Sequence, residues 1–289
     1  MQHRDASVLG LQAPLRSAVT CSVAGFGIIR GGSELLETLR RNPVAAPGTP
    51  LPAGFLKHAE KQTVAGLAAV YQAIYNFDLA RVEQRHWGVI AAPTFLGRSG
   101  MADALARFAV EGAWGISPHL IPHQSLHAVS GTISQSLRIH GPNFGVGGAP
   151  GAVVEAVLAA ASLLALPGIP GIWLVLTDHE REFIPVDRAE PASKCEPEPD
   201  CRALALALIP GRTSSIGLSL QICPEHSRVG VTANAMPVDT IPADMHGCGS
   251  LCDVGDLIEA FAHEECRGSW RLGTSGWLRL LREDAESPC

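Results

Sequence analysis

Apolar positions recur along the first 223 residues in short runs that are rich in β-branched side chains. Runs of this kind, bounded by glycine, proline and polar residues, predict buried strands. The expected strands are residues 19–29, 87–92, 144–146, 172–177, 203–209 and 216–223. Segments with helical periodicity and capping residues lie between them and predict helices over residues 33–41, 61–76, 99–110, 123–139 and 150–166. Strands that alternate with helices indicate an α/β fold.

The periodic pattern weakens after residue 223. One further helix is expected over residues 254–265, and residues 269–281 predict a closing strand or a hairpin that carries two tryptophans. The proline-containing stretch 183–200 is expected to be an exposed loop between two strands.

Residues 156–177 carry no charged side chain, and this length alone would suffice for a membrane span. Two prolines and two glycines within residues 167–171 would break such a helix, so a buried helix, a turn and a buried strand are expected instead. No secretory signal is visible near the first residues, which predicts a cytoplasmic location without a membrane span.

The composition allows a large core, because 46% of the 289 residues are hydrophobic and 17% are charged. The net charge is -6 and the basic residues are scattered, which argues against a nucleic-acid surface. Eight cysteines without a repeating spacing favour reduced thiols over a disulfide framework.

Gly25 and Gly27 follow a predicted strand, as the first glycines of a dinucleotide-binding fingerprint do. Arg30 stands where the third glycine should be. The partial match favours a glycine-rich turn between a strand and a helix, without a bound phosphate.

His119, His123 and His127 are spaced four residues apart. His123 and His127 could share one helix face, as two metal ligands do, but Pro122 places His119 before the start of the helix. Imidazoles that form hydrogen bonds at the start of a helix are therefore the favoured interpretation.

A looser group of residues near the C-terminus could hold zinc, although its spacing matches no common zinc pattern. The group consists of His246, Cys248, Cys252, His263 and Cys266. We expect no metal and no cofactor.

The region 118–178 combines a helix containing Ser-Gly-Thr-Ile-Ser (residues 130–134), the sequence Gly-Pro-Asn-Phe (residues 141–144), a glycine-rich bend and a long apolar helix (residues 153–166). In this order the region resembles the N-terminal half of β-ketoacyl synthases, the condensing enzymes of the thiolase fold. In that family, a nucleophilic cysteine lies at the start of the buried helix.

The resemblance extends in order over residues 19–223, with residues 23–27 similar to the first strand of the family and residues 88–93 similar to a later one. It implies a layered α-β-α, thiolase-like fold whose N-terminal half is essentially complete and whose C-terminal half is strongly shortened. The implied organisation is an N-terminal extension (1–18), a ketosynthase N-terminal-like domain (19–223) and a short C-terminal region (224–289) packed on the same core.

Alignment of residues 141–144 with the family pattern puts its cysteine at Pro150. A helix start favours a thiolate, because free backbone N–H groups and the helix dipole stabilise negative charge there. Residues 145–154 contain no Cys, Ser, Thr or Lys, which excludes covalent acyl transfer at this helix if the alignment holds. Proline suits the first turn of a helix, so we expect the helix to begin at Pro150.

A complete synthase has a second half that supplies two histidines and a lysine. Only 66 residues follow Cys223 here. The sequence around His246 faintly resembles the family's His-Gly-Thr-Gly-Thr stretch, with a spacing two residues too long. His246 is thus a candidate relic of the catalytic site, and a loop histidine before a helix is an equal alternative.

By resemblance, the chain is a non-catalytic subunit of the chain-length-factor type in bacterial type II fatty-acid, polyketide or aryl-polyene systems. The implied partners are a full-length β-ketoacyl synthase and an acyl carrier protein. The residues implied at the twofold interface are Asn143, Phe144 and Val146. Those implied to approach the acyl tunnel are Phe108, Leu120 and His123.

Two other classes of function stay open. One is an enzyme built on a degenerate thiolase fold that uses a histidine or zinc site. The other is a homodimeric protein that binds acyl thioesters without a synthase partner.

Overall fold

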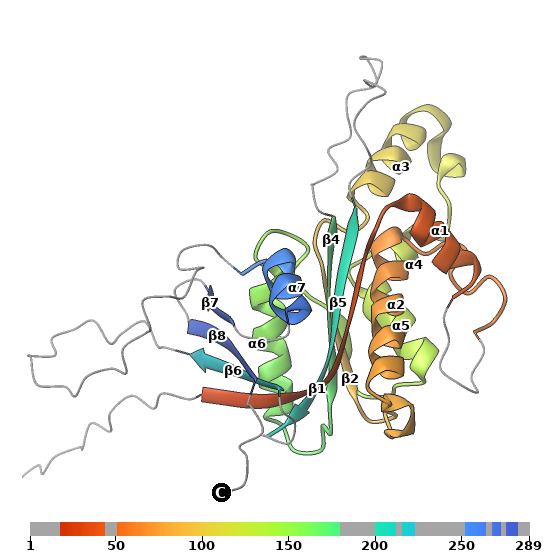
Figure 1. Ribbon diagram of the computed structural model, residues 1–289. Coiled ribbons are helices and arrows are strands. Elements are labelled where there is room, and N and C mark those ends of the chain that lie inside the picture. Colours follow the sequence, from red (N-terminus) through yellow and green to blue (C-terminus); the bar gives the residue numbers. More distant parts are fainter. Residues whose placement is uncertain are drawn as a thin grey trace, which may run out of the picture.

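The structure is a computed structural model that describes residues 18–43, 51–179, 200–211, 216–222, 252–263, 268–272 and 276–282. Its strands are β1 (Ala18–Gly31), β2 (Gly88–Pro93), β3 (Asn143–Gly145), β4 (Ile172–His179), β5 (Cys201–Pro210), β6 (Ile216–Ile222), β7 (Gly268–Leu272) and β8 (Gly276–Arg282). Its α-helices are α1 (Ser33–Arg41), α2 (Lys61–Asn76), α3 (Arg98–Glu111), α4 (Leu120–Gln124), α5 (His127–Leu137), α6 (Ala152–Leu164) and α7 (Val254–Ala262). The 3₁₀ turn η1 (Leu79–Arg81) lies between α2 and β2, and η2 (Gly112–Gly115) lies between α3 and α4. Figure 1 shows how the helices and strands are arranged.

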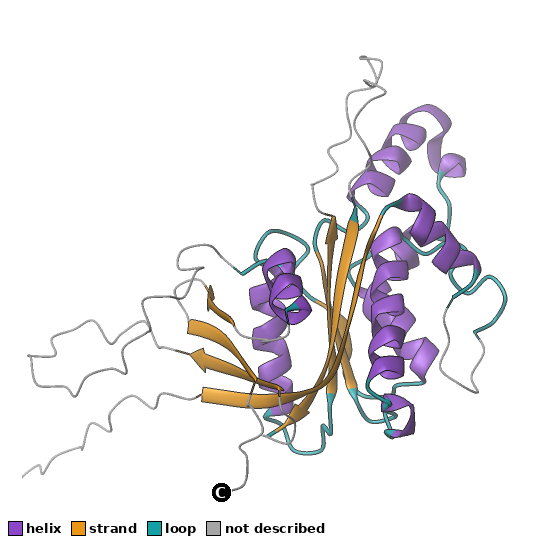
Figure 2. Cartoon of the chain, in the orientation of Figure 1, coloured by secondary structure: helices purple, strands orange, loops and turns teal. Residues whose placement is uncertain are grey.

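The strands of the described residues form one eight-stranded sheet in the order β3-β2-β4-β5-β1-β6-β8-β7. Strand β2 pairs in parallel with β3 and β4, whereas every pairing from β4 through β5 to β7 is antiparallel. Figure 2 shows how the sheet turns strongly between its central strands and the group formed by β6, β7 and β8. The hairpin expected near the C-terminus is confirmed as β7 and β8, which extend the same sheet.

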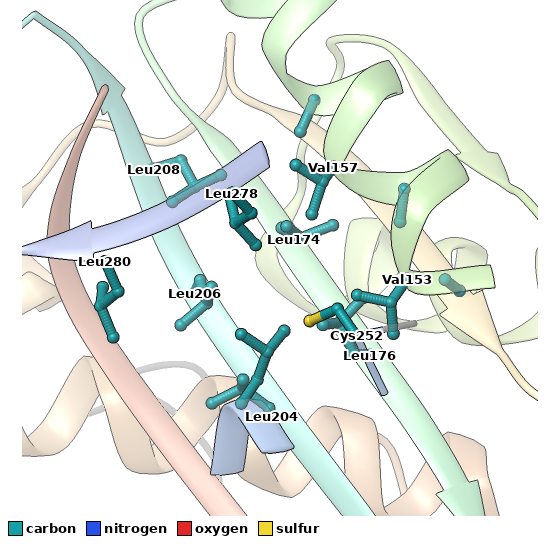
Figure 3. Packing of buried hydrophobic residues seen from close by; sticks show 14 of the residues in the cluster. Val153, Val157, Leu174, Leu176, Leu204, Leu206, Leu208, Cys252, Leu278 and Leu280 are labelled. Carbon is teal, nitrogen blue, oxygen red and sulfur yellow. The ribbon is translucent and has the colours of Figure 1, made fainter. Parts of the chain in front are cut away.

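Helices cover both faces of the central strands, which confirms the layered α/β architecture (Figure 1). Leu174 and Leu176 of β4 contribute to the core beneath α6 and α7, as Figure 3 shows. The alternate residues Trp173 and Val175 belong to the second core, with α2 and α5. Because both faces of β4 are buried, its residues 172–176 are continuously apolar rather than alternating.

Glycine permits a very close approach between α2 and β1. A Cβ atom at Gly27 would lie 2.0 Å from the carbonyl oxygen of Ala69 in α2. Gly25 and Gly27 thus lie inside strand β1 and not in a turn between a strand and a helix. The expected glycine-rich turn is therefore wrong. Close packing explains these glycines instead of a phosphate, because Gly27 lies against the backbone of α2 and Gly25 lies against the side chains of Phe77 and Leu79.

The predicted strands are confirmed within two residues at each end, and the predicted helices over residues 33–41 and 61–76 match α1 and α2. The single helix expected over residues 123–139 is wrong, because it is divided into α4 and α5. Ser125 has an extended backbone (φ -85°, ψ 157°) that ends α4. His123 and His127 consequently belong to different helices and do not share a face.

The uncharged stretch 156–177 consists of the end of α6, a turn and strand β4, as expected. In the described part of the chain, no helix is long and apolar enough to cross a membrane. The loop predicted over residues 183–200 lies outside the described residues except at its last position.

We predict that Gly27→Ala will destabilise the protein by about 3 kcal/mol, because a methyl group there would meet backbone atoms of α2 that cannot move aside separately. Gly32→Ala is the matched control, since its Cβ would meet only the Asp200 carboxylate at 3.4 Å, and its cost should stay below about 1 kcal/mol. Urea unfolding followed by circular dichroism measures both. Equal unfolding midpoints for the two variants would contradict the close contact between α2 and β1 at Gly27.

Candidate functional site

The segment between β3 and α6 holds the position implied for the family nucleophile. The backbone N–H of Val146 donates to the carbonyl of Ala91 at 2.9 Å, so the contact with β2 continues past β3. A Cβ atom at Gly145 would lie 2.0 Å from the carbonyl oxygen of Leu126. Only glycine permits this approach, which places the start of α5 directly against the segment.

Pro150 and Gly151 form a tight turn in front of α6. The N–H of Ala152 donates to the carbonyl of Ala149 at 3.1 Å, and Gly151 has φ 92° and ψ 0°. These values identify a type II β-turn, in which proline favours the second position and glycine the third. Helix α6 begins only at Ala152, so the expected helix start at Pro150 is wrong.

This turn offers no group for covalent chemistry. Pro150 is exposed, and the first residues of α6 are Ala152, Val153 and Val154. The described cysteines lie elsewhere and are buried. Burial raises the pKa of the Cys21 thiol to about 12, and it also raises the pKa values of Cys201 and Cys252, so these thiols stay protonated at neutral pH.

The residues expected at a twofold interface lie on or beside β3, which is an edge strand of the sheet. Asn143, Phe144 and Val146 are half-buried. Phe144 and Val146 pack against the core beneath α6. The Oδ1 atom of Asn143 is buried without a hydrogen-bond partner among the described residues. Their role at an interface stays a prediction.

The residues expected to approach an acyl tunnel lie on two neighbouring helices. Phe108 belongs to α3 and is 52% exposed. Leu120 is the first residue of α4, and His123 lies one turn later on the same helix; both are half-buried. Their tunnel role also stays a prediction.

Three histidines meet at α4, but they are not the three that the sequence spacing suggests. The ring of His58 stacks on that of His119 with centroids 4.4 Å apart, and the ring of His123 lies 5.9 Å from that of His58. His127 instead begins α5, where its Nδ1 atom lies 3.3 Å from the Ser130 hydroxyl. His58 carries no sequence signal for this cluster, because it is far from α4 in the chain.

Desolvation lowers the pKa values of His58 and His123, and the neighbouring rings add to this effect. The imidazoles of His58 and His123 are therefore neutral at pH 7. Stacked parallel rings do not direct two nitrogen atoms at one point. No group of three or more His, Cys, Asp or Glu residues in the described ranges is arranged to hold a metal ion. His246, Cys248 and Cys266 lie outside those ranges.

Helix α3, turn η2 and helix α4 together expose many large apolar side chains, and we call this the α3–α4 surface. Its exposed residues are Met101, Leu105, Phe108, Val110, Trp114 and Ile121. Trp114 is 98% exposed and Leu105 is 63% exposed. Exposed apolar side chains that gather on neighbouring elements are candidates for contact with a partner.

No family model matches the sequence, and no curated protein matches it. The structure is similar to that of a type II PKS acyl-carrier protein in complex with its ketosynthase bound to the hexaketide, with 16% identity and a TM-score of 0.48 over 66% of this chain and 62% of that chain. It is similar to a ketosynthase in complex with its chain length factor from Xenorhabdus doucetiae (17% identity, TM-score 0.47, 69% and 60% of the two chains). A β-ketoacyl synthase from Burkholderia phymatum STM815 gives 13% identity and a TM-score of 0.47 over 71% and 63% of the two chains.

These similar structures are ketosynthases, alone or with a chain length factor or carrier protein, as the sequence resemblance leads one to expect. At these identities the likeness concerns the fold alone. The chain spans less than two thirds of the length of each of the structures it matches here.

We predict that Pro150→Cys will introduce a thiol that iodoacetamide alkylates at least about tenfold faster than the buried Cys21, whose pKa is raised to about 12. Peptide-resolved mass spectrometry measures both rates. The unchanged protein is the control, and its peptide covering residues 145–154 should carry no acyl group after incubation with acyl-carrier thioesters.

The Pro150→Cys variant should not catalyse decarboxylative condensation, because a thiol without positioned histidine and lysine partners gives little rate. Efficient condensation would contradict this expectation and indicate a working histidine site in the C-terminal region. A stable acyl adduct on residues 145–154 of the unchanged protein would overturn the alignment at Pro150.

Proposed function

We propose that the protein is a ketosynthase-like subunit of the chain-length-factor type, without catalytic activity of its own, that pairs with a full-length β-ketoacyl synthase. Its setting would be a bacterial type II system for fatty acids, polyketides or aryl polyenes in the cytoplasm, with an acyl carrier protein delivering the chain. The subunit would limit the length of the acyl chain by the shape of the surface that it adds to the tunnel.

The observation that carries this proposal is the type II turn at Pro150 and Gly151. A nucleophile in the implied position would need a reactive side chain beside the free N–H groups of α6. The turn instead uses the residue pair that stabilises its backbone, and the helix begins with alanine and valine. The fold retains the buried helix without the covalent chemistry.

The α3–α4 surface supports the existence of a partner. Its exposed leucine, phenylalanine and tryptophan side chains are of the types that dominate the energetics of protein interfaces. Strand β3 also supports the existence of a partner, because an edge strand can continue its sheet across a subunit boundary. Obligate pairs bury well over roughly 1,000 Å² of surface, so a stable pair with a synthase would cover more than β3 alone.

The proposed tunnel contacts lie close to this surface. Phe108 belongs to the α3–α4 surface itself, and Leu120 and His123 lie beside it on α4. Because lowered pKa values keep His58 and His123 neutral at pH 7, these two imidazoles can border an apolar acyl chain without a charge. Covering of Phe108 by a partner would therefore create an apolar wall beside uncharged rings.

We predict that the double variant Leu105→Ser, Trp114→Ser will bind the β-ketoacyl synthase of its own host at least about tenfold more weakly, because it removes two exposed apolar anchors. Tyr75→Ser is the matched control, since Tyr75 is 81% exposed at the end of α2, outside the α3–α4 surface. Co-purification and size-exclusion chromatography of co-expressed chains measure the difference. Unchanged pairing in the double variant would contradict this assignment of the interface.

Size-exclusion chromatography, together with the metal content of the purified protein, separates the alternative functions. A protein that forms homodimers and binds acyl-carrier thioesters, but never pairs with a synthase, would favour the acyl-thioester binding protein. A stoichiometric metal in the purified protein would favour a degenerate enzyme.

We predict that Phe144→Asp will lose the synthase partner, because a carboxylate on the edge strand would be desolvated in a continuous sheet. Phe144→Leu is the control and should retain the partner. Far-UV circular dichroism separates the two roles of Phe144, since it also packs on the core beneath α6. Loss of the circular dichroism signal would assign Phe144 to internal packing, and a folded Phe144→Asp protein that still co-elutes would exclude β3 from the interface.

A further inference from the structure

A cavity of about 500 Å³, open to the surface, lies where the ends of α2 and α5 meet the segment that leads into β2. Its ionisable lining residues are Glu83, Arg85, Arg138 and His140. The rest of the wall consists of the polar residues Gln84 and Ser136 and of apolar side chains that include Val82 and Leu137. This volume is within the range of sites that bind small organic molecules.

Positive charge predominates in this cavity although the whole chain is acidic. Among the described residues, the guanidinium groups of Arg85 and Arg138 form no ion pair. The Glu83 carboxylate is engaged locally, because its Oε1 atom accepts the backbone N–H of Arg85 at 2.9 Å. The cavity thus contains two arginines against one carboxylate, with a histidine that adds a donor.

Hydrogen bonds hold the walls of the cavity in place. The backbone N–H of His140 donates to the carbonyl of Arg85 at 2.7 Å, which joins its two cationic segments. The Gln84 side chain donates from Nε2 to the Leu79 carbonyl at 3.1 Å. Its Oε1 accepts the indole N–H of the buried Trp173 at 2.9 Å. The segment that carries Arg85 is therefore anchored to the core of the sheet.

Arg138 has a backbone conformation that favours glycine. It ends α5 with φ 55° and ψ 41°, in the left-handed region. The turn itself is made by the backbone, since the N–H of Ile139 donates to the Ser134 carbonyl at 2.9 Å. Glycine would make this turn with less strain, so the arginine side chain requires another explanation.

We propose that this cavity binds a small organic anion, with its carboxylate or phosphate group on Arg85 and Arg138 and its apolar body against Val82 and Leu137. Arginine is suited to both groups, because its planar fork donates two parallel hydrogen bonds to either of them. The site is separate from the turn at Pro150. It lies at the start of β2, whereas Val146 meets β2 near the strand's end and Gly148 meets Phe95 beyond it.

The experiment is isothermal titration calorimetry of the full chain with four probes: hexyl phosphate, hexanoate, inorganic phosphate and hexyltrimethylammonium. We expect hexyl phosphate or hexanoate to bind, and the tighter of the two identifies the anionic group. Inorganic phosphate should bind more weakly because it lacks the apolar body, and hexyltrimethylammonium should not bind because it carries the wrong charge.

Arg138→Gly and Arg85→Gln should each weaken binding of the tighter probe roughly tenfold, which corresponds to the loss of a charge-assisted hydrogen bond. Arg138→Gly should remain folded, because its backbone conformation favours glycine. Arg81→Gln is the matched control: Arg81 lies in η1, outside the cavity lining, and pairs with Asp78 at 3.4 Å. Its affinity should be unchanged.

Three results would overturn the proposal. They are the absence of binding by both hexyl phosphate and hexanoate, equal binding of hexyltrimethylammonium, and unchanged affinity in both Arg138→Gly and Arg85→Gln. Because no probe is a thioester and no variant changes the α3–α4 surface, these outcomes are independent of the partner experiments.

Discussion

Helix α2 lies so close to strand β1 that no side chain fits between them at Gly27. The helix is buried along most of its length, and small residues such as Ala65, Gly66 and Ala69 form much of that length. This contact sets the position of both ends of α2. At its start, Gln62 donates to the carbonyl of Thr94 and accepts from the Thr177 hydroxyl, both at 2.8 Å, which places the loop that follows β2. At its end, the helix forms part of the wall of the cationic cavity.

The sequence predicts the sheet well because burial on both faces leaves a direct signal. Apolar runs such as β4 and β5 have few alternatives to a central strand in a layered α/β protein. The break between α4 and α5 has no such signal. It depends on a tertiary contact, because the carbonyl of Leu126 must approach Gly145 on a strand that is adjacent only in the folded chain. The glycines of β1 have no direct signal for the same reason, since helix α2 and the residues Phe77 and Leu79 that follow it approach them only in the folded chain.

The features of the candidate site also differ in how far the sequence alone predicts them. The lack of a nucleophile follows from residue identity alone, so the sequence suffices to predict it. The type II turn was also within reach, because Pro-Gly is its usual pair, but a preference for proline at helix starts competed with it. The α3–α4 surface was not predictable from the pattern of apolar residues. An amphipathic helix has the same pattern whether its apolar side faces the core or a partner, and only the folded structure distinguishes them.

Backbone strain is distributed unevenly over this fold. Among the described residues, three that are not glycine have a left-handed backbone: Asp78, Phe95 and Arg138. Asp78 begins the 3₁₀ turn that leads to the cavity, and Arg138 lies in its wall. Phe95 donates its N–H to the carbonyl of Gly148, beside the turn at Pro150. Aspartate tolerates this conformation, whereas phenylalanine and arginine are strained in it.

The turn at Pro150 itself is relaxed, since Gly151 provides its positive φ without a Cβ. The position implied for the nucleophile therefore has an unstrained backbone, whereas Arg138, which lines the cavity, has a strained one. The fold does not need this strain, because glycine would form the same turn at less cost, so the left-handed arginine in the cavity wall supports the proposed anion site.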